Sequence, residues 1–377
     1  MKQRRALWIS LLGLSALALC AGGAFAWHHL AAQEKPPRVP DTPGFAMVKN
    51  MRLGWNLGNT LDAHGEGIAG LDTQYCWGNP DTTQEMIDAV KAAGFATLRV
   101  PVTWANHFGG APDYTIDEAW LGRVQEVVDY AYGIGMYVIL NMHHDDHYWY
   151  IPDEAHEAAL TAQYISLWEQ ICARFADYDE RLLFQAFNEP RVIGSEREWK
   201  GGTPAERAVL GRLNAAFVQT VRGSGGQNAA RWLLLPTYAA SSDRRALRGI
   251  KLPKDERLIV SVHGYMTWGY ASGPAGEYTP ELRDRVDGML HEFYRHFVAR
   301  GIPVVITEFG AVAKEDEAGR ERYAAEYVAE AARYGIACVW WDNGNVSLPE
   351  DRFSLLDRES LQWRYPGVVK ALREAIV

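Results

Sequence analysis

Eight short runs rich in valine, isoleucine, leucine and aromatic residues recur along the chain, separated by longer segments with helical periodicity. They are MRLGWNLG (51–58), FATLRVPV (95–102), MYVILNMH (136–143), LLFQAFN (182–188), RWLLLPTY (231–238), LIVSVHGY (258–265), PVVITEF (303–309) and IACVWW (336–341). Alternating strand and helix patterns are typical of repeated β-α units around a parallel sheet. Because eight such units close into a barrel, the sequence predicts an α/β fold, a single-domain (β/α)8 TIM barrel.

The order helix, glycine, strand recurs in this pattern, for example at Gly135 and Gly335. Glycine adopts the left-handed backbone conformation that a tight turn after a helix needs. We therefore expect both glycines to end a helix and lead directly into a barrel strand.

The first 26 residues have the pattern of an export signal. A basic start, MKQRR, precedes an apolar run of about 21 residues that ends in Ala24-Phe25-Ala26, an A-x-A cleavage pattern. The run is long enough to cross a bilayer, so residues 1–26 are either a signal peptide or an uncleaved N-terminal membrane anchor. Residues 27–44, rich in proline and polar residues, predict an extended spacer before a folded domain over 45–377. We expect a secreted or periplasmic protein, free or anchored to the membrane.

Charge and cysteine content exclude several function classes. The net charge is −9, and removal of the three cations in residues 1–26 leaves 35 basic and 47 acidic residues, a net charge of −12, which argues against nucleic-acid binding. Only Cys76, Cys172 and Cys338 follow the leader, and no CxxC pair indicates a zinc or redox site. No phosphate-binding glycine loop is evident. We expect no cofactor, and a monomeric protein.

Polar and charged groups lie where the predicted strands end, and in a parallel barrel these ends share one rim. They are Asn56 and Asn59, Arg99, His143 with His144, Asn188 and Glu189, Tyr238, His263 with Tyr265, Glu308, and Trp341 with Asp342. Any one of them has an ordinary structural explanation, such as a surface ion pair or a hydrogen-bonded core histidine. A polar group at almost every strand end of one rim instead indicates a functional site.

Two carboxylates stand out within this set. Glu189 follows the fourth strand and Glu308 follows the seventh, each after an apolar run where an unpartnered charge would cost several kcal/mol. Those strands lie across the barrel mouth from each other. Paired carboxylates across a cleft are the equipment of glycoside hydrolysis, and a separation of about 5 Å would mean a covalent glycosyl intermediate with retained configuration.

Several motifs extend this interpretation. The segments LGWNLGNTLDA, TLRVPVTW, VILNMHH, FNEP, VHGY, VVITEFGA and WWDNG resemble glycoside hydrolase family 5, the cellulase family of clan A, and most of all its subfamily 4 of endoglucanases and xyloglucanases. The resemblance spans about residues 50–375 and includes all strands but the fifth. It implies that residues 45–377 are the catalytic domain of a retaining endo-β-1,4-glucanase that hydrolyses β-glucan polysaccharides. A xyloglucanase, lichenase or mannanase of the same family stays open.

The resemblance also implies the catalytic roles. Glu308 would be the nucleophile and Glu189 the general acid/base. Arg99 and Tyr265 would hydrogen-bond the Glu308 carboxylate and favour its charged form. Glu189 must stay protonated in the resting enzyme, with His263 nearby as a partner in the return of the proton.

Substrate contacts are implied in the same way. Asn188 would hold the sugar 2-hydroxyl, His143 a neighbouring hydroxyl, with His144 beside it in support, and Trp341 would give an aromatic floor. Further tryptophans follow or end strands, where their rings can stack on successive sugars and make an open cleft for endo-acting cleavage. These are Trp104, Trp149 and Trp268, together with Trp341.

Two loops depart from the family pattern. After the sixth strand the chain reads VHGYMTWGYAS, and after the third it reads HHDDHYWYIPDE, longer and more aromatic than expected. Both would line the cleft, so the preferred polymer stays open.

Two readings from other classes are less favoured. HHDDH (143–147) suggests the metal site of a metal-dependent barrel hydrolase, but consecutive strand residues point to opposite faces, and no second His/Asp cluster supplies further ligands. We therefore expect no metal. A non-catalytic carbohydrate-binding protein is the second alternative, which turnover of any β-glucan would exclude.

Overall fold

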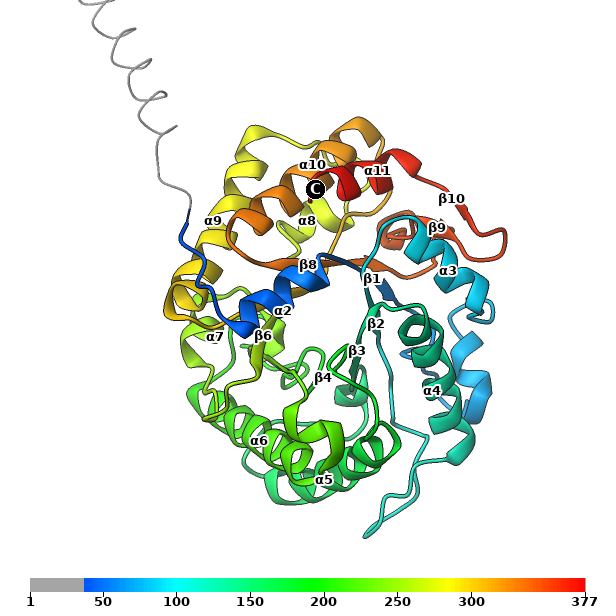
Figure 1. Ribbon diagram of the computed structural model, residues 1–377, viewed down its shortest axis with the longest axis vertical. Helices are drawn as coiled ribbons and strands as arrows, with labels where there is room; N and C mark the ends of the chain where they lie inside the picture. Colours follow the sequence, from blue (N-terminus) through cyan, green and yellow to red (C-terminus); the bar gives the residue numbers. More distant parts are fainter. Residues whose placement is uncertain (1–36, 377) are drawn as a thin grey trace, which may run out of the picture. The chain divides into compact units, whose positions relative to one another are not determined.

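Eight parallel strands form a closed barrel in chain order, with β8 paired back to β1 (Figure 1). The strands are β1 (Leu53–Leu57), β2 (Thr97–Val100), β3 (Tyr137–Asn141), β4 (Leu182–Gln185), β5 (Leu233–Pro236), β6 (Leu258–His263), β7 (Val304–Phe309) and β8 (Ala337–Asp342). Each begins within two residues of the start of its apolar run. The predicted (β/α)8 barrel is confirmed in a computed structural model of the protein.

Most of the helices surround the barrel and connect consecutive strands, while the first precedes β1 and the last follows β8 (Figure 1). They are α2 (Pro43–Met51), α3 (Gln84–Ala92), α4 (Glu118–Gly133), α5 (Glu157–Arg174), α6 (Pro204–Gly223), α7 (Arg244–Gly249), α8 (Trp268–Ser272), α9 (Pro280–His296), α10 (Glu317–Arg333) and α11 (Pro366–Glu374). Short 3-10 helices are η1 (Gly70–Tyr75), η2 (Asp145–His147), η3 (Gly226–Ala230), η4 (Tyr238–Ala240), η5 (Val298–Arg300) and η6 (Pro349–Asp351). A small antiparallel pair, β9 (Leu356–Asp357) and β10 (Gln362–Trp363), follows β8.

The predicted glycine turns are present. Gly135 and Gly335 have φ of 79° and 72°, and each lies between the end of a helix and the start of the next strand. This left-handed conformation is strained for residues with a Cβ, so glycine allows helix and strand to be joined by the shortest turn.

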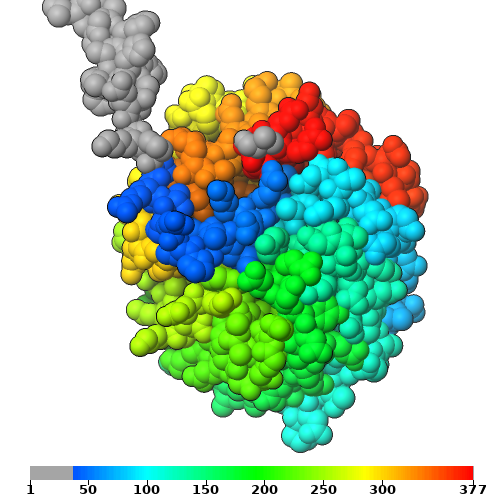
Figure 2. Space-filling model, in the orientation of Figure 1, coloured from blue at the N-terminus to red at the C-terminus, as the bar shows by residue number. Residues whose placement is uncertain are grey.

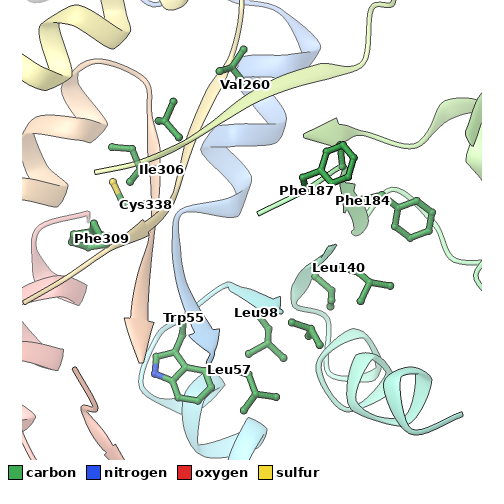
Figure 3. Packing of buried hydrophobic residues seen from close by; sticks show 14 of the residues in the cluster. Trp55, Leu57, Leu98, Leu140, Phe184, Phe187, Val260, Ile306, Phe309 and Cys338 are labelled. Atoms are coloured by element: carbon green, nitrogen blue, oxygen red, sulfur yellow. The ribbon is translucent and has the colours of Figure 1, made fainter. Parts of the chain in front are cut away.

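The main hydrophobic core lies between the barrel and the helices. The outward side chains of the strands, among them Trp55, Leu98, Leu140, Phe184 and Ile306, are fully buried there (Figure 3). Burial of a large apolar side chain contributes roughly 1.5–3 kcal/mol, so this layer supplies most of the driving force for closing the barrel.

A second, smaller core fills one end of the barrel interior. Inward residues such as Ile139, Leu183 and Val305 cluster with Met47 and Met51 of α2. The helix therefore closes this end, and in Figures 1 and 2 α2, in blue, lies across the barrel in the face shown.

The inward side chains become polar two residues further along the same strands. Asn141 follows Ile139, Gln185 follows Leu183 and Thr307 follows Val305, and all are fully buried. Because side chains alternate along a strand, these polar groups point into the barrel at its carboxyl end. The barrel is thus apolar at the α2 end and polar at the other, where the predicted site residues lie.

The structure describes residues 37–376, and a compact unit begins at Val39. The predicted signal peptide or anchor over 1–26 and most of the spacer lie outside the described residues. Within residues 37–376, no helix combines the length and the apolar character that crossing a bilayer requires.

Candidate active site

One imidazole ring joins the two glutamates that the sequence singled out. His263, the last residue of β6, lies with Nδ1 2.8 Å from Oε1 of Glu189 and Nε2 3.4 Å from Oε1 of Glu308. Glu308 lies on β7 and Glu189 lies four residues beyond the end of β4. Barrel closure therefore brings both carboxylates to the same place at the carboxyl end of the strands.

Arg99 forms the centre of a buried hydrogen-bond network that includes Glu308. It lies on β2, is fully buried, and its Nη1 donates to Oε1 of Glu308 at 2.7 Å and to Oδ1 of Asn56 at 2.8 Å. Its Nη2 donates to Oδ1 of Asn188 and its Nε to Oε1 of Gln185, each at 2.8 Å. Four hydrogen bonds fix the planar guanidinium, so the position of Glu308 is set by four strands at once.

Tyr265 holds the other oxygen of Glu308. Its hydroxyl donates to Oε2 at 3.0 Å, while Arg99 donates to Oε1. Both carboxylate oxygens thus accept hydrogen bonds, one of them from a buried cation, which stabilises the ionised form. A carboxylate held in this way can act as a nucleophile whose attacking oxygen has a defined direction.

Glu189 has the opposite electrostatic environment. Burial raises the pKa of its carboxyl above the ordinary value, while the charges of Arg191 and Arg99 oppose that rise. Burial also lowers the pKa of the neighbouring His263 to about 4. Near neutral pH this favours a neutral imidazole, whose Nδ1 lone pair can accept a hydrogen bond from a protonated Glu189. The pair can therefore store a proton and release it.

Asn188 and His143 present polar atoms beside this pair. Oδ1 of Asn188 is occupied by Arg99, which leaves its Nδ2 without a hydrogen-bond partner among residues 37–376. The amide of Asn141 donates to Nδ1 of His143 at 3.1 Å, so the proton of the neutral ring is placed on Nε2. Burial holds the pKa of His143 well below its usual value. Both side chains can donate a hydrogen bond to a ligand hydroxyl.

Trp341, near the end of β8, lies parallel to the His143 ring, with centroids 5.8 Å apart and an interplanar angle of 1°. A Cβ built on Gly58 would come within 2.7 Å of the Trp341 ring, so only glycine leaves room for the indole there. The partly exposed ring can serve as a flat surface for a sugar.

His144 lies next to His143, although neighbouring strand residues were expected to diverge. The two rings have centroids 4.4 Å apart, and both Nε2 atoms lie within 4.0 Å of Oδ2 of Asp62. That geometric expectation is wrong because β3 ends at Asn141, so the chain is no longer extended at these residues. The structure thus brings all nine predicted site residues to one end of the barrel.

Sequence reasoning missed several residues that hold the site in place. Gln185 accepts from Arg99 and donates to Ser261. Arg191 joins Asp146 at 2.5 Å, lies 3.0 Å from Glu198, and comes within 3.7 Å of Glu189. Gln185 could have been recognised as a polar residue at an inward position of an apolar strand. Arg191 lies two residues after Glu189, so its place beside the predicted acid was a local signal, whereas its ion pair with Asp146, 45 residues away, was not visible in the sequence.

The four proposed stacking tryptophans differ in exposure. Trp104 is fully buried and its Nε1 donates to the Asn141 carbonyl, so the expectation that it stacks on a sugar is wrong. Trp149 is partly buried against Phe108 and donates to Asp145. Trp268 is 61% exposed. Loop packing, which a sequence pattern does not reveal, removed Trp104 from the cleft.

Comparisons with known proteins agree with this geometry. The family model described as Cellulase (glycosyl hydrolase family 5) matches residues 61–347. Endoglucanase A of Ruminococcus albus is 42% identical over 345 residues, covering 89% of this chain and 93% of that protein. Cellulase/esterase CelE of Acetivibrio thermocellus is 45% identical over 337 residues, covering 88% of this chain, which spans only 40% of that protein.

A solved structure extends the comparison. A GH5-4 broad specificity endoglucanase from Ruminococcus champanellensis with bound cellotriose superposes with a TM-score of 0.85 at 41% identity, covering 89% of this chain and 99% of that one. The family match contains β2 to β8, and both glutamates lie within it.

Proposed function

The chain belongs to glycosyl hydrolase family 5, the cellulase family, and from this membership we propose that it is a retaining endo-β-1,4-glucanase acting on β-glucan polysaccharides. One observation carries the proposal: Glu189 and Glu308 contact opposite nitrogens of His263, and they differ in surroundings. Burial raises the pKa of the Glu189 carboxyl, whereas the Glu308 carboxylate accepts hydrogen bonds from the buried Arg99 and from Tyr265. Two carboxyl groups separated in this way supply an acid and a nucleophile at the same pH.

Glu308 is the nucleophile in this proposal. Hydrogen bonds from Arg99 and Tyr265 orient its carboxylate, which attacks the anomeric carbon to form a covalent glycosyl intermediate. The glycosidic oxygen leaves with a proton from the acid, so no free alkoxide forms.

Glu189 is the acid and then the base. Burial raises the pKa of its carboxyl, which favours the protonated form, and the acid gives its proton to the leaving oxygen. It then takes a proton from the water that attacks the glycosyl intermediate. The hydrogen bond to neutral His263 orients the carboxyl through both steps.

Three further side chains are proposed sugar ligands. The free amide of Asn188 binds the 2-hydroxyl, a contact that strengthens as the sugar gains oxocarbenium character. Nε2 of His143 binds a neighbouring hydroxyl, with His144 in support, and the Trp341 ring lies under the sugar face.

The location follows from the leader. We propose that the protein acts outside the cytoplasm, secreted or in the periplasm, because residues 1–26 have an export pattern and polymeric β-glucan does not enter cells. The same segment, left uncleaved, would anchor it to the membrane.

Activity on a panel of polymers tests the proposal. Carboxymethylcellulose, barley β-glucan, xyloglucan, glucomannan and xylan are assayed side by side for viscosity and for reducing ends. An endoglucanase lowers the viscosity of β-glucan much faster than it produces reducing ends. Release of monosaccharide alone from chain ends would contradict endo cleavage, and preference for xyloglucan or mannan would select one of the family alternatives.

A further inference from the structure

Three histidines outside the catalytic pair lie close together at the edge of the site. They are His64, from the loop after β1, and His144 and His147, from the turn after β3. One ring nitrogen of each lies within 4.8 Å of the others, and the three ring centroids are 5.3 to 5.6 Å apart. This grouping does not depend on the proposed hydrolytic function.

The local fold explains why two of these rings point the same way. His144 is the N-cap residue of the 3-10 helix η2, and His147 is its last residue, with a hydrogen bond from His147 N to His144 O of 3.1 Å. In a 3-10 turn the side chains at positions i and i+3 are nearly eclipsed. The two imidazoles therefore project from one face of the turn, and His64 approaches that face from the neighbouring loop.

The chemistry of the cluster fits a transition-metal ion. Neutral imidazole is a preferred ligand of Zn²⁺, Cu²⁺, Ni²⁺ and Co²⁺. Ligand nitrogens around one tetrahedral Zn²⁺ lie roughly 3.4 Å apart, given Zn–N bonds of about 2.0–2.1 Å. His64 is partly exposed and His147 is exposed, so their rings can turn. A turn that moves their ring nitrogens by about an ångström would bring the three nitrogens to the spacing around one ion, and the exposure leaves an entry path.

An outer hydrogen bond is already in place. Nδ1 of His64 lies 2.8 Å from the hydroxyl of Tyr148. When Nδ1 carries the proton and donates it to that hydroxyl, the Nε2 lone pair is free for an ion. Metal-bound histidines commonly have their second nitrogen fixed by such a partner.

We propose that His64, His144 and His147 form a binding site for one Zn²⁺ or a similar transition-metal ion, with the fourth position open to water. The ion would link the loop after β1 to the turn after β3, beside the proposed sugar-binding histidine. The sequence argument against a metal in this region had two grounds: that His143 and His144 diverge on a strand, and that no second His/Asp cluster supplies further ligands. The structure places these two rings 4.4 Å apart and brings His64 from another loop to His144 and His147.

A second group of possible ligands, Asp62, His143 and His144, lies deeper. Asp62 is fully buried, and its two oxygens already accept hydrogen bonds from the backbone amides of Asn59 and Thr60. An ion could reach this group only through the interior, because Asp62 is fully buried and His143 is buried as well. The outer cluster is the more accessible of the two.

Titration with the metal alone tests the site. The purified full-length protein, without a histidine tag and stripped of metal with EDTA, is titrated with ZnCl2 by calorimetry. We expect one Zn²⁺ per chain, and a Kd that rises about 100-fold or more in His64→Ala and in His147→Ala. His156→Ala is the matched control. This exposed histidine lies nine residues after His147 and pairs with Asp153, so the variant should bind Zn²⁺ as the wild type does.

Absorption spectroscopy with Co²⁺ identifies the ligands independently. Co²⁺ added to the wild type should give strong visible d–d bands of low coordination number, which His64→Ala should lose, while circular dichroism shows each variant folded. Absence of stoichiometric Zn²⁺ binding by the wild type would overturn the proposal. Wild-type affinity in His64→Ala would also overturn it, by moving the ion to the Asp62 group.

Discussion

Nη1 of Arg99 lies 2.7 Å from Oε1 of Glu308, in an ion pair whose arginine is fully buried within the barrel. The two residues are 209 positions apart in the chain, on β2 and β7. A buried charge that loses its partner is costly, so this pair ties the geometry of the proposed active site to the stability of the fold.

Replacement of Arg99 by Met should destabilise the protein by about 3–5 kcal/mol, because Glu308 keeps a buried charge without its cation. The double variant with Glu308→Gln should lose less than the sum of the single losses, by roughly 1–3 kcal/mol. Urea unfolding measures each free energy. Arg244→Met is the control, since its ion pair with Glu292 is exposed and should contribute under about 1 kcal/mol. Additive losses would mean that the pair is not coupled.

Glu189→Gln and Glu308→Gln should each lower kcat by several orders of magnitude, about 10³-fold or more, without unfolding the protein. Glutamine keeps the shape of the side chain but neither gives up a proton nor attacks carbon. Initial rates on barley β-glucan and thermal melts provide the comparison. Glu157→Gln, which removes a surface ion pair with Arg212, should keep full activity. Near wild-type turnover in Glu308→Gln would refute the nucleophile assignment.

Chemical rescue separates the two roles. Azide should restore activity to Glu308→Gly and give a glycosyl azide of inverted configuration, because the small anion takes the place of the missing nucleophile. Rescue of Glu189→Gly should give a retained product, since azide then attacks the glycosyl intermediate. The anomeric configuration by NMR distinguishes these outcomes, and the reverse pattern would exchange the assignments.

His107 should make the protein less stable in acid. Its ring is buried and stacks on Trp120 with centroids 3.7 Å apart, and burial lowers its pKa to about 4 from an ordinary value near 6.5. Between these pH values the unfolded chain binds a proton that the folded one does not, so stability falls as pH falls. Over this whole pH range, protonation of His107 in the unfolded chain lowers the free energy of unfolding by about 3 kcal/mol. His107→Phe should weaken the pH dependence of the free energy of unfolding between pH 6.5 and 4. An unchanged slope of that free energy against pH would contradict this.

Replacement by Ala should affect polymer cleavage at Trp268 and stability at Trp104. Trp268 is exposed beside Tyr265, with ring centroids 5.5 Å apart, so its loss should weaken cleavage of a polymer more than cleavage of a short aryl glycoside. Trp104 is fully buried, so its loss should cost about 3–5 kcal/mol of stability. Kinetics on both substrates and urea unfolding separate the effects. Equal loss on both substrates in Trp268→Ala would argue against a distal sugar contact.

Local pattern was sufficient to predict the barrel. Strand runs, helical periodicity and turn glycines such as Gly135 and Gly335 act over a few residues, and each is visible in the sequence by itself. Because the strands are parallel, their carboxyl ends must share one rim, which made Glu189 and Glu308 candidates for one site before any distance was known.

Other features depended on contacts between distant segments. The convergence of Asn56, Gln185 and Asn188 on Arg99 results from barrel closure and strand register, which no local pattern encodes. Packing of the loop after β2 buried Trp104, which looked like a cleft residue in the sequence.

The end of β3 shows most clearly which features follow from local sequence and which depend on contacts between distant segments. The sequence by itself determined that histidines follow this strand, and thus which chemical groups the turn carries. The tertiary structure decided that the strand stops at Asn141 and that a 3-10 turn follows, which gathers His144 and His147 near His64. Residue types and their local periods are properties of the sequence, whereas the direction of a side chain beyond a strand depends on what the folded chain packs against it.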